Sequence, residues 1–148
     1  MATESRKQEV DETSKNDDAR EINARYRAYC DACESNQLEK VPSFWSLPAL
    51  FTLDTGEPDT SHLLLSSPEE MIKLYGTLFG PSTGVNKTVI DSSEVTFYGD
   101  KLATIKTSLR HLAASKLHDR QDAVYGCRKV DRGWVFISHL SVDSTEMR

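Results

Sequence analysis

The chain has 148 residues and a formal net charge of −5, with 38% hydrophobic and 28% charged residues. These values are ordinary for one globular domain, and the basic residues are scattered along the chain, so neither a membrane span nor a nucleic-acid-binding surface is expected. The N-terminus lacks the apolar core of a secretory signal, which predicts a cytoplasmic protein whose three cysteines are reduced thiols.

The first eighteen residues are nearly all polar, and Val10 is their only sizeable apolar side chain after Met1. Such a segment cannot bury enough surface to offset the entropy lost on ordering, so residues 1–18 are expected to form a flexible arm that could be helical in part. From Asp18 onward, apolar residues recur at spacings of three and four, which predicts an amphipathic helix capped by Asp18 and Glu21. The buried stripe of this helix would comprise Ile22, Tyr26, Tyr29, Cys30 and Cys33.

The next part of the chain predicts a short helix and two strands. Apolar residues between Leu38 and Leu47, interrupted by prolines, indicate a short helix that leads into a strand at residues 49–53. Residues 54–60 are rich in turn formers. A brief strand over residues 62–65 would therefore return alongside the first.

The clearest helix start is Ser67-Pro68-Glu69-Glu70. Ser67 suits the N-cap, Pro68 suits the first helical position, and Glu70 completes a capping box. Apolar residues continue at helical spacing as far as Phe79, and Gly80-Pro81 ends the pattern.

Everything after Val85 is typical of β-strands separated by short turns. The predicted strands cover residues 87–98, 101–113, 122–130 and 134–142, with a polar loop at residues 115–120. Helices first and a long antiparallel meander last predict the α+β class. The domain is expected to span residues 19–143, followed by a tail at 144–148.

Four stretches of the sequence carry a family resemblance. They are Arg25-Tyr26-Arg27-Ala28-Tyr29, Phe44-Trp45 before residues 49–53, the helix start at Ser67, and Asp131-Arg132-Gly133-Trp134-Val135. Over about residues 19–143 the chain resembles the nuclear transport factor 2-like superfamily, which includes SnoaL-like polyketide cyclases, ketosteroid isomerases and scytalone dehydratases. The resemblance implies a cystatin-like fold, in which a curved antiparallel sheet wraps on helices as an α+β cone around an apolar pocket.

The resemblance also implies positions for catalytic groups. Tyr29 lies about where ketosteroid isomerases carry the tyrosine of their oxyanion hole. Their general-base carboxylate would fall at Leu53, and only a shift of one residue brings in Asp54. Their second acid would fall within residues 123–126, where no carboxylate occurs. The acid of the SnoaL type would fall near His139, again without a carboxylate, so neither known pair is reproduced.

Two histidines inside predicted strands are further candidates. His111 alternates with Leu109 and His139 with Ile137, so each imidazole could face the pocket and act as acid or base. The alternative for each is a structural histidine that is hydrogen-bonded within the sheet or at its edge. The proposed catalytic residues are Tyr29, Asp54, His111 and His139, and the expected pocket lining is Tyr26, Phe51, Tyr75, Leu109, Tyr125 and Ile137.

The sequence contains no metal-ligand cluster, phosphate-binding glycine loop or nucleophile elbow, so no metal and no cofactor are expected. The C-x-x-C pair at Cys30 and Cys33 falls near the end of a predicted helix and is interpreted as two small core residues.

Three functions remain open on this sequence. The domain could bind a small hydrophobic molecule, or act as an isomerase, cyclase or dehydratase on a carbonyl compound. It could also serve as a noncatalytic dimeric scaffold subunit. A homodimer through the outer sheet face is expected, with Val95, Phe97, Trp134 and Phe136 as its apolar residues.

Overall fold

The computed structural model describes residues 2–54 and 61–144, and the side chains of residues 15–54 and 61–143. The elements occur in the order α1 (Ala2–Glu34), the 3₁₀ helix η1 (Leu38–Phe44), β1 (Trp45–Asp54), β2 (Ser61–Leu65), α2 (Pro68–Leu78), the short 3₁₀ turn η2 (Gly80–Ser82), β3 (Val85–Phe97), β4 (Leu102–Ala113), β5 (Lys116–Val130) and β6 (Gly133–Ser144). The predicted α+β class is confirmed. Apart from Asp54 and Ser144, the predicted turn at 54–60 and the tail at 144–148 lie outside the described residues.

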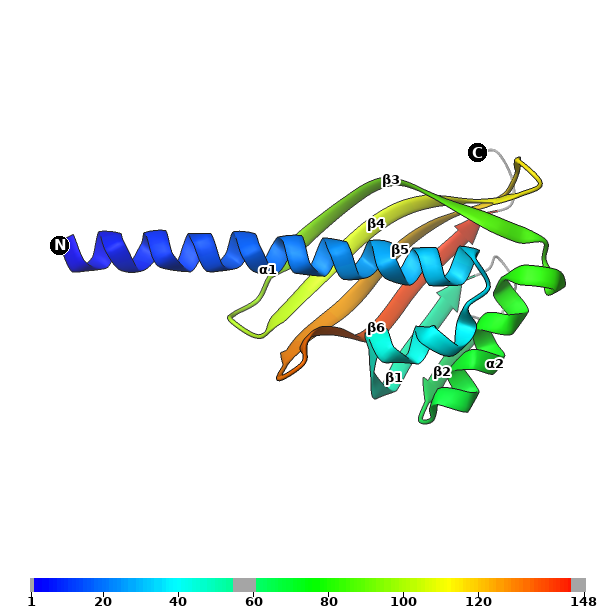
Figure 1. Cartoon of the computed structure of the whole chain (residues 1–148), viewed down its shortest axis with the longest axis horizontal. Helices are drawn as coiled ribbons and strands as arrows, with labels where there is room; N and C mark the ends of the chain where they lie inside the picture. The colour runs from blue at the N-terminus through cyan, green and yellow to red at the C-terminus, as the bar shows by residue number, and fades with distance from the viewer. Residues whose placement is uncertain (1, 55–60, 145–148) are drawn as a thin grey trace.

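The six strands form one sheet in the order β2-β1-β6-β5-β4-β3. The meander from β3 to β6 is antiparallel as predicted, but β1 pairs with β6 in parallel, so the sheet is mixed. Figure 1 shows the sheet curving around α1, with α2 beside β2. One face of the sheet is therefore covered by helices, and the opposite face is called the outer face below.

The long helix begins earlier than predicted. Residues 2–18 contain no proline or glycine to interrupt a helix, and α1 starts at Ala2 and extends past the sheet (Figure 1). Asp18 is thus inside the helix, where its carboxylate pairs with Lys129 Nζ at 3.1 Å instead of capping the end. The predicted stripe from Ile22 to Cys33 is buried against the sheet. The flexibility of residues 1–18 stays a prediction.

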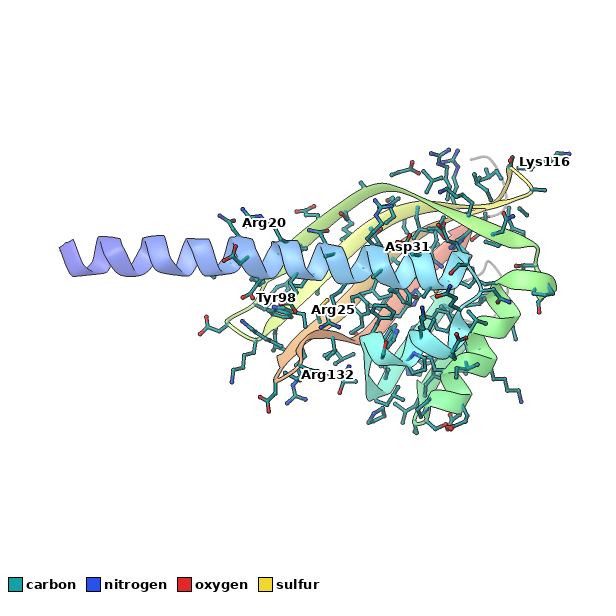
Figure 2. All side chains as sticks on the ribbon, viewed as in Figure 1. Arg20, Arg25, Asp31, Tyr98, Lys116 and Arg132 are labelled. Carbon is teal, nitrogen blue, oxygen red and sulfur yellow. The ribbon has the colours of Figure 1, made fainter. Side chains whose placement is uncertain are left out.

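Polar contacts tie α1 to the β5–β6 turn. Glu21 Oε2 accepts the backbone N–H of Trp134 at 2.7 Å, and Arg25 donates to the carbonyl of Arg132 at 3.0 Å. Arg132 in turn donates to the carbonyls of Ser43 and Trp45, both at 2.6 Å. Figure 2 labels Arg25 and Arg132 in the region between the helix and this turn. These contacts set the position of α1, and hence of Tyr29, over the sheet.

The second long helix begins as the sequence predicts. Ser67 has extended backbone geometry and its hydroxyl accepts the backbone N–H of Glu70 at 3.2 Å. Met71 and Tyr75 lie on the buried face of α2. The capping signal at Ser67 therefore fixes where α2 begins, and with it which face of the helix carries Tyr75.

The prediction of a polar loop at residues 115–120 is wrong. β4 and β5 are joined by a two-residue turn, and β5 starts at Lys116 (Figure 2). Ala114 and Ser115 both adopt positive φ angles, 50° and 66°, as a tight hairpin requires. Neither residue type is usual at such positions, so the sequence carries no hairpin signal there. Residues 116–120 consequently belong to the sheet.

The predicted dimer-forming residues lie on the helix-covered face. Trp134 packs against Phe97 with ring centroids 5.9 Å apart, and Val95 lies against the same core. Phe136 is also buried, because a β-bulge leaves Ile137 unpaired between the Phe136 and Ser138 pairs. This extra residue puts Phe136 and His139 on one face, although simple alternation separates them.

Candidate functional site

A cavity of about 100 Å³ lies between the second half of α1, the end of α2 and the inner face of β4, β5 and β6. Its walls are aromatic and apolar at depth, and polar side chains that keep partial exposure stand at its mouth. The lining residues are Tyr29, Cys30, Cys33, Tyr75, Leu78, Phe79, Thr83, Thr88, Leu109, His111, His118, Asp119, Gln121, Tyr125, His139 and Asp143.

Three buried phenols meet at the inner end of the cavity. The hydroxyl of Tyr29 lies 2.5 Å from that of Tyr75 and 3.2 Å from that of Tyr125. Burial, followed by the neighbouring phenols, raises the pKa of Tyr29 far above its ordinary value, and burial raises the pKa of the other two as well. All three groups therefore stay protonated. Two contacts use two of the three protons, so one proton remains for an acceptor outside this phenol cluster.

His111 and Asp119 form a buried pair on the cavity wall. His111 Nδ1 lies 2.9 Å from Asp119 Oδ1, and His118 Nδ1 lies 3.0 Å from the same oxygen. Burial alone would raise the pKa of Asp119, but hydrogen bonds and charge from His111, and then from His118, hold it below its ordinary value. An ionised carboxylate can only accept, so His111 presents Nδ1–H to Asp119 and keeps Nε2 for other chemistry.

His139 is a neutral imidazole in an aromatic environment. Its ring lies between those of Tyr125 and Phe51, with centroids 4.5 and 5.1 Å away. Burial, with a smaller contribution from His111, lowers its pKa to about 3. Neither ring nitrogen has a hydrogen-bond partner among the residues that the structure describes. His139 is therefore suited to donate or accept a hydrogen bond rather than to hold a proton.

The structure brings together three of the four proposed catalytic residues: Tyr29, His111 and His139. Asp54 lies on the outer face instead, in a groove shared with Thr52 and Val142. Leu53, which alternates with Asp54, is the buried one of the two. The register of β1 thus directs the carboxylate away from the cavity.

Of the expected lining residues, Tyr75, Leu109 and Tyr125 line the cavity. Tyr26 and Phe51 belong to the closed core beside it, where the Tyr26 ring packs edge-on to Tyr125 at 5.3 Å. Ile137 is not among the residues that line the cavity. It is the unpaired residue of the β6 bulge, and the bulge separates it from the face that carries His139.

Sequence reasoning missed several polar residues that line the cavity. Asp119, His118 and Gln121 were assigned to a loop or its border, and only the two-residue hairpin places them on the wall. Asp143 alternates with His139 and Ser141, so strand periodicity was a usable signal for it. Asp143 accepts from Gln121 Nε2 at 2.8 Å, and burial raises the pKa of its carboxyl.

The C-x-x-C cysteines also line the cavity. Cys30 and Cys33 are buried free cysteines. Burial raises the pKa of Cys30 to about 12 and that of Cys33 well above its ordinary value. Both are therefore protonated thiols that serve as small wall residues.

Within residues 15–54 and 61–143, no three side chains of His, Cys, Asp or Glu are grouped so as to hold a metal ion. The helices within residues 2–54 and 61–144 are too short or too polar to cross a bilayer.

Solved structures with this architecture are numerous. A domain of unknown function with a cystatin-like fold from Nostoc punctiforme aligns with a TM-score of 0.67 at 20% identity, covering 88% of this chain and 78% of that one. An NTF2-like protein from Novosphingobium aromaticivorans gives 0.68 at 13% identity, with coverages of 90% and 86%. A proposed dehydratase of the NTF2-like family from Streptomyces avermitilis gives 0.64 at 15% identity, with coverages of 88% and 99%.

At these identities the solved structures establish the cystatin-like fold alone. No curated protein matches the sequence. A family model does match, and it covers residues 19–144, nearly the whole of the sheet and the helices packed on it. The chain therefore belongs to the family described as NTF2-like protein (DUF6841).

Proposed function

We propose that this protein binds a small uncharged carbonyl compound in its cavity and moves a proton on it by acid–base chemistry. The observation that carries the proposal is the 2.9 Å contact between His111 Nδ1 and Asp119 Oδ1, on the wall of the cavity that also holds the phenol cluster. An oriented base and a fixed hydrogen-bond donor on one cavity are the two parts that enolisation needs.

Each part has a defined role in the proposed reaction. Nε2 of His111 removes a proton from the carbon next to the carbonyl group, and Asp119 stabilises the imidazolium that forms. The carbonyl oxygen gains negative charge and accepts a hydrogen bond from the phenol hydroxyl whose proton is not used within the cluster. Return of the proton to another atom gives an isomerisation, and departure of a β-hydroxyl as water gives a dehydration.

The buried carboxylate favours this chemistry over simple binding of an apolar ligand. Moving an ionised carboxylate out of water costs several kcal/mol unless partners compensate for the lost hydration. Contacts with two imidazoles compensate Asp119 for this lost hydration. A pocket for a purely apolar molecule needs none of these groups. The arrangement is what a base held in one tautomer requires.

The size and charge of the cavity restrict the ligand. An engineered cavity of about 150 Å³ holds benzene, so a cavity of about 100 Å³ accommodates at most a small ring or a branched chain. The lining includes two aspartates and neither lysine nor arginine. An anionic ligand would be repelled, and an uncharged one would not.

The proposal can be tested with a small ring ketone in deuterated water. We expect the wild-type protein to accelerate exchange of the α-protons of cyclopentanone, measured by proton NMR. His111→Ala should slow this exchange by roughly tenfold or more, because the oriented base is lost. His62→Ala, which removes an exposed histidine bonded to Thr52, is the matched control and should exchange at the wild-type rate. Equal rates with and without protein, or in wild type and His111→Ala, would contradict the proposal.

A second proposed property is a homodimer formed through the outer face. It is supported by exposed apolar side chains on the adjacent strands β2, β1 and β6, namely Leu50, Leu64, Leu140 and Val142. Contiguous apolar patches on a protein surface commonly mark interfaces. Such a dimer leaves the cavity on the other face open to its ligand.

A further inference from the structure

His118 and Asp119 are neighbours in sequence, yet both line the cavity. In a regular strand, successive side chains point to opposite faces. Here Asp119 pairs with His111, whereas Leu117 pairs with Leu112, which leaves His118 as an extra residue in β5. The result is a β-bulge, a feature that can redirect a side chain beside a functional site.

The bulge lets two imidazoles reach one carboxylate oxygen. His111 Nδ1 and His118 Nδ1 lie 2.9 and 3.0 Å from Asp119 Oδ1, one from the neighbouring strand and one from the bulge itself. The side chains of His111 and Asp119 are each 10% exposed, whereas that of His118 is 38% exposed. His118 therefore stands at the cavity mouth, and the other two lie behind it.

We infer that His118 is a positioning residue, which holds the Asp119 carboxylate turned toward His111 so that His111 keeps Nε2 directed to the ligand. A carboxylate with two donors on one oxygen has its side-chain torsions fixed from two sides, and a carboxylate with one donor can rotate about that single contact. The inference rests on the proposed function, in which His111 is the base. It adds that the bulge in β5 exists to build this base.

Two ionisable groups of β6 lie close enough to act on the pair through charge: Asp143 interacts with Asp119 and His111, and His139 interacts with His111. Asp143 of β6 is bonded to Gln121, and the neutral His139 of β6 is packed between aromatic rings. Directly after α2, the Phe79 ring lies edge-on to His111 at 5.3 Å and carries no charge. The two histidines are thus the groups whose hydrogen bonds hold Asp119 ionised.

The test compares His118→Leu, which removes the donor, with His118→Asn, whose amide nitrogen can occupy the place of Nδ1. Imidazole ¹⁵N NMR reports which nitrogen of His111 is protonated, and carboxyl ¹³C NMR reports the titration of Asp119. In His118→Leu we expect the pKa of Asp119 to rise, because one hydrogen bond to its charged form is lost. We also expect the Nδ1 proton of His111 to exchange with water roughly tenfold faster.

His118→Asn should restore both readouts, and His62→Leu, on the outer face, should change neither. A wild-type Asp119 titration and a wild-type His111 exchange rate in His118→Leu would overturn the inference. So would an Asn variant that behaves like the Leu variant. These readouts need no substrate, so their outcome is independent of the ketone experiment. If the ketone experiment fails and the NMR readouts change as expected, the proposed reaction is ruled out but the positioning contact of His118 stands.

Discussion

Among the residues that the structure describes, the imidazole of His139 has none of the hydrogen-bond partners that a buried polar ring normally has. Both of its nitrogens are buried and unbonded within the described part of the chain, and its pKa is lowered to about 3. The unfolded chain binds a proton at this histidine near its ordinary value of 6.5, whereas the folded chain does not. As the pH falls from 6.5 toward 3, protons therefore favour the unfolded state.

Replacing His139 by phenylalanine should remove this penalty. Phenylalanine fits between the Phe51 and Tyr125 rings and cannot titrate, so the free energy of unfolding should depend less on pH. The difference in slope between wild type and variant should reach at most about 1.4 kcal/mol per pH unit. Urea unfolding from neutral pH down to about pH 4.5 measures it, above the range in which Asp119 titrates in the unfolded chain.

Identical slopes in the two proteins would show that His139 is charged or solvated in the folded state. Asp119 gives the opposite kind of shift, since its folded pKa is lowered. Its contribution is present above its ordinary value of 3.8 and is lost only as the pH falls below that value. The two residues can therefore be distinguished by their pH windows.

At the scale of single residues, the family resemblance pointed to Tyr29, and alternation with apolar residues in predicted strands pointed to His111 and His139. Asp119 was not identified, because its orientation depends on a bulge that no local pattern announces. Asp54 became a candidate only through a shift of one residue in the register of its strand. The pairing of β1 with β6 fixes that register, and Asp54 lies on the outer face.

The β4–β5 hairpin shows the same limit at the scale of an element. Its loop is only Ala114 and Ser115, and both have positive φ angles. An alanine or serine in this region carries a steric cost that glycine and, in part, asparagine avoid. The chain tolerates this cost because the long ladder between β4 and β5 determines where the turn must be.

The combined substitution of Ala114→Asn and Ser115→Gly should stabilise the protein. Asn-Gly suits a two-residue hairpin of this geometry. Relief of the left-handed strain is worth about 1–2 kcal/mol per residue, and the extra chain entropy of glycine offsets about 0.5–1 kcal/mol of it, so the net gain should be about 1 kcal/mol at each position. The midpoint of urea unfolding measures it, and the slope of the transition should stay unchanged. A lower midpoint would mean that the turn has another geometry than the one described.

At the scale of the whole molecule, the outer face determines how copies of the chain associate. Leu140 and Val142 are 52% and 55% exposed on β6, and Leu64 is 61% exposed on β2. The sequence predicted a dimer through this face but selected Val95, Phe97, Trp134 and Phe136, which pack under α1. The apolar area of the proposed interface comes from different residues.

Leu140→Asp should shift the protein from dimer to monomer. A charge in the middle of an apolar interface would be desolvated without a partner, which costs more than a surface substitution. Light scattering should give twice 16.6 kDa for the wild type and 16.6 kDa for the variant. Tyr98→Asp is the control, because Tyr98 is exposed at the β3–β4 turn away from this patch (Figure 2). A monomeric wild type would end the dimer proposal.

By itself, the sequence determined the α+β class, the buried stripe of α1, the start of α2 directly after its N-cap Ser67, and the existence of most strands. These features depend on residues close together in the chain, where periodicity and capping act directly. Only the tertiary structure decided the parallel pairing of β1 with β6, the bulges at His118 and Ile137, and the face that α1 covers. Each of these is settled by contacts between distant segments, and one inserted residue is enough to exchange the two faces of a strand.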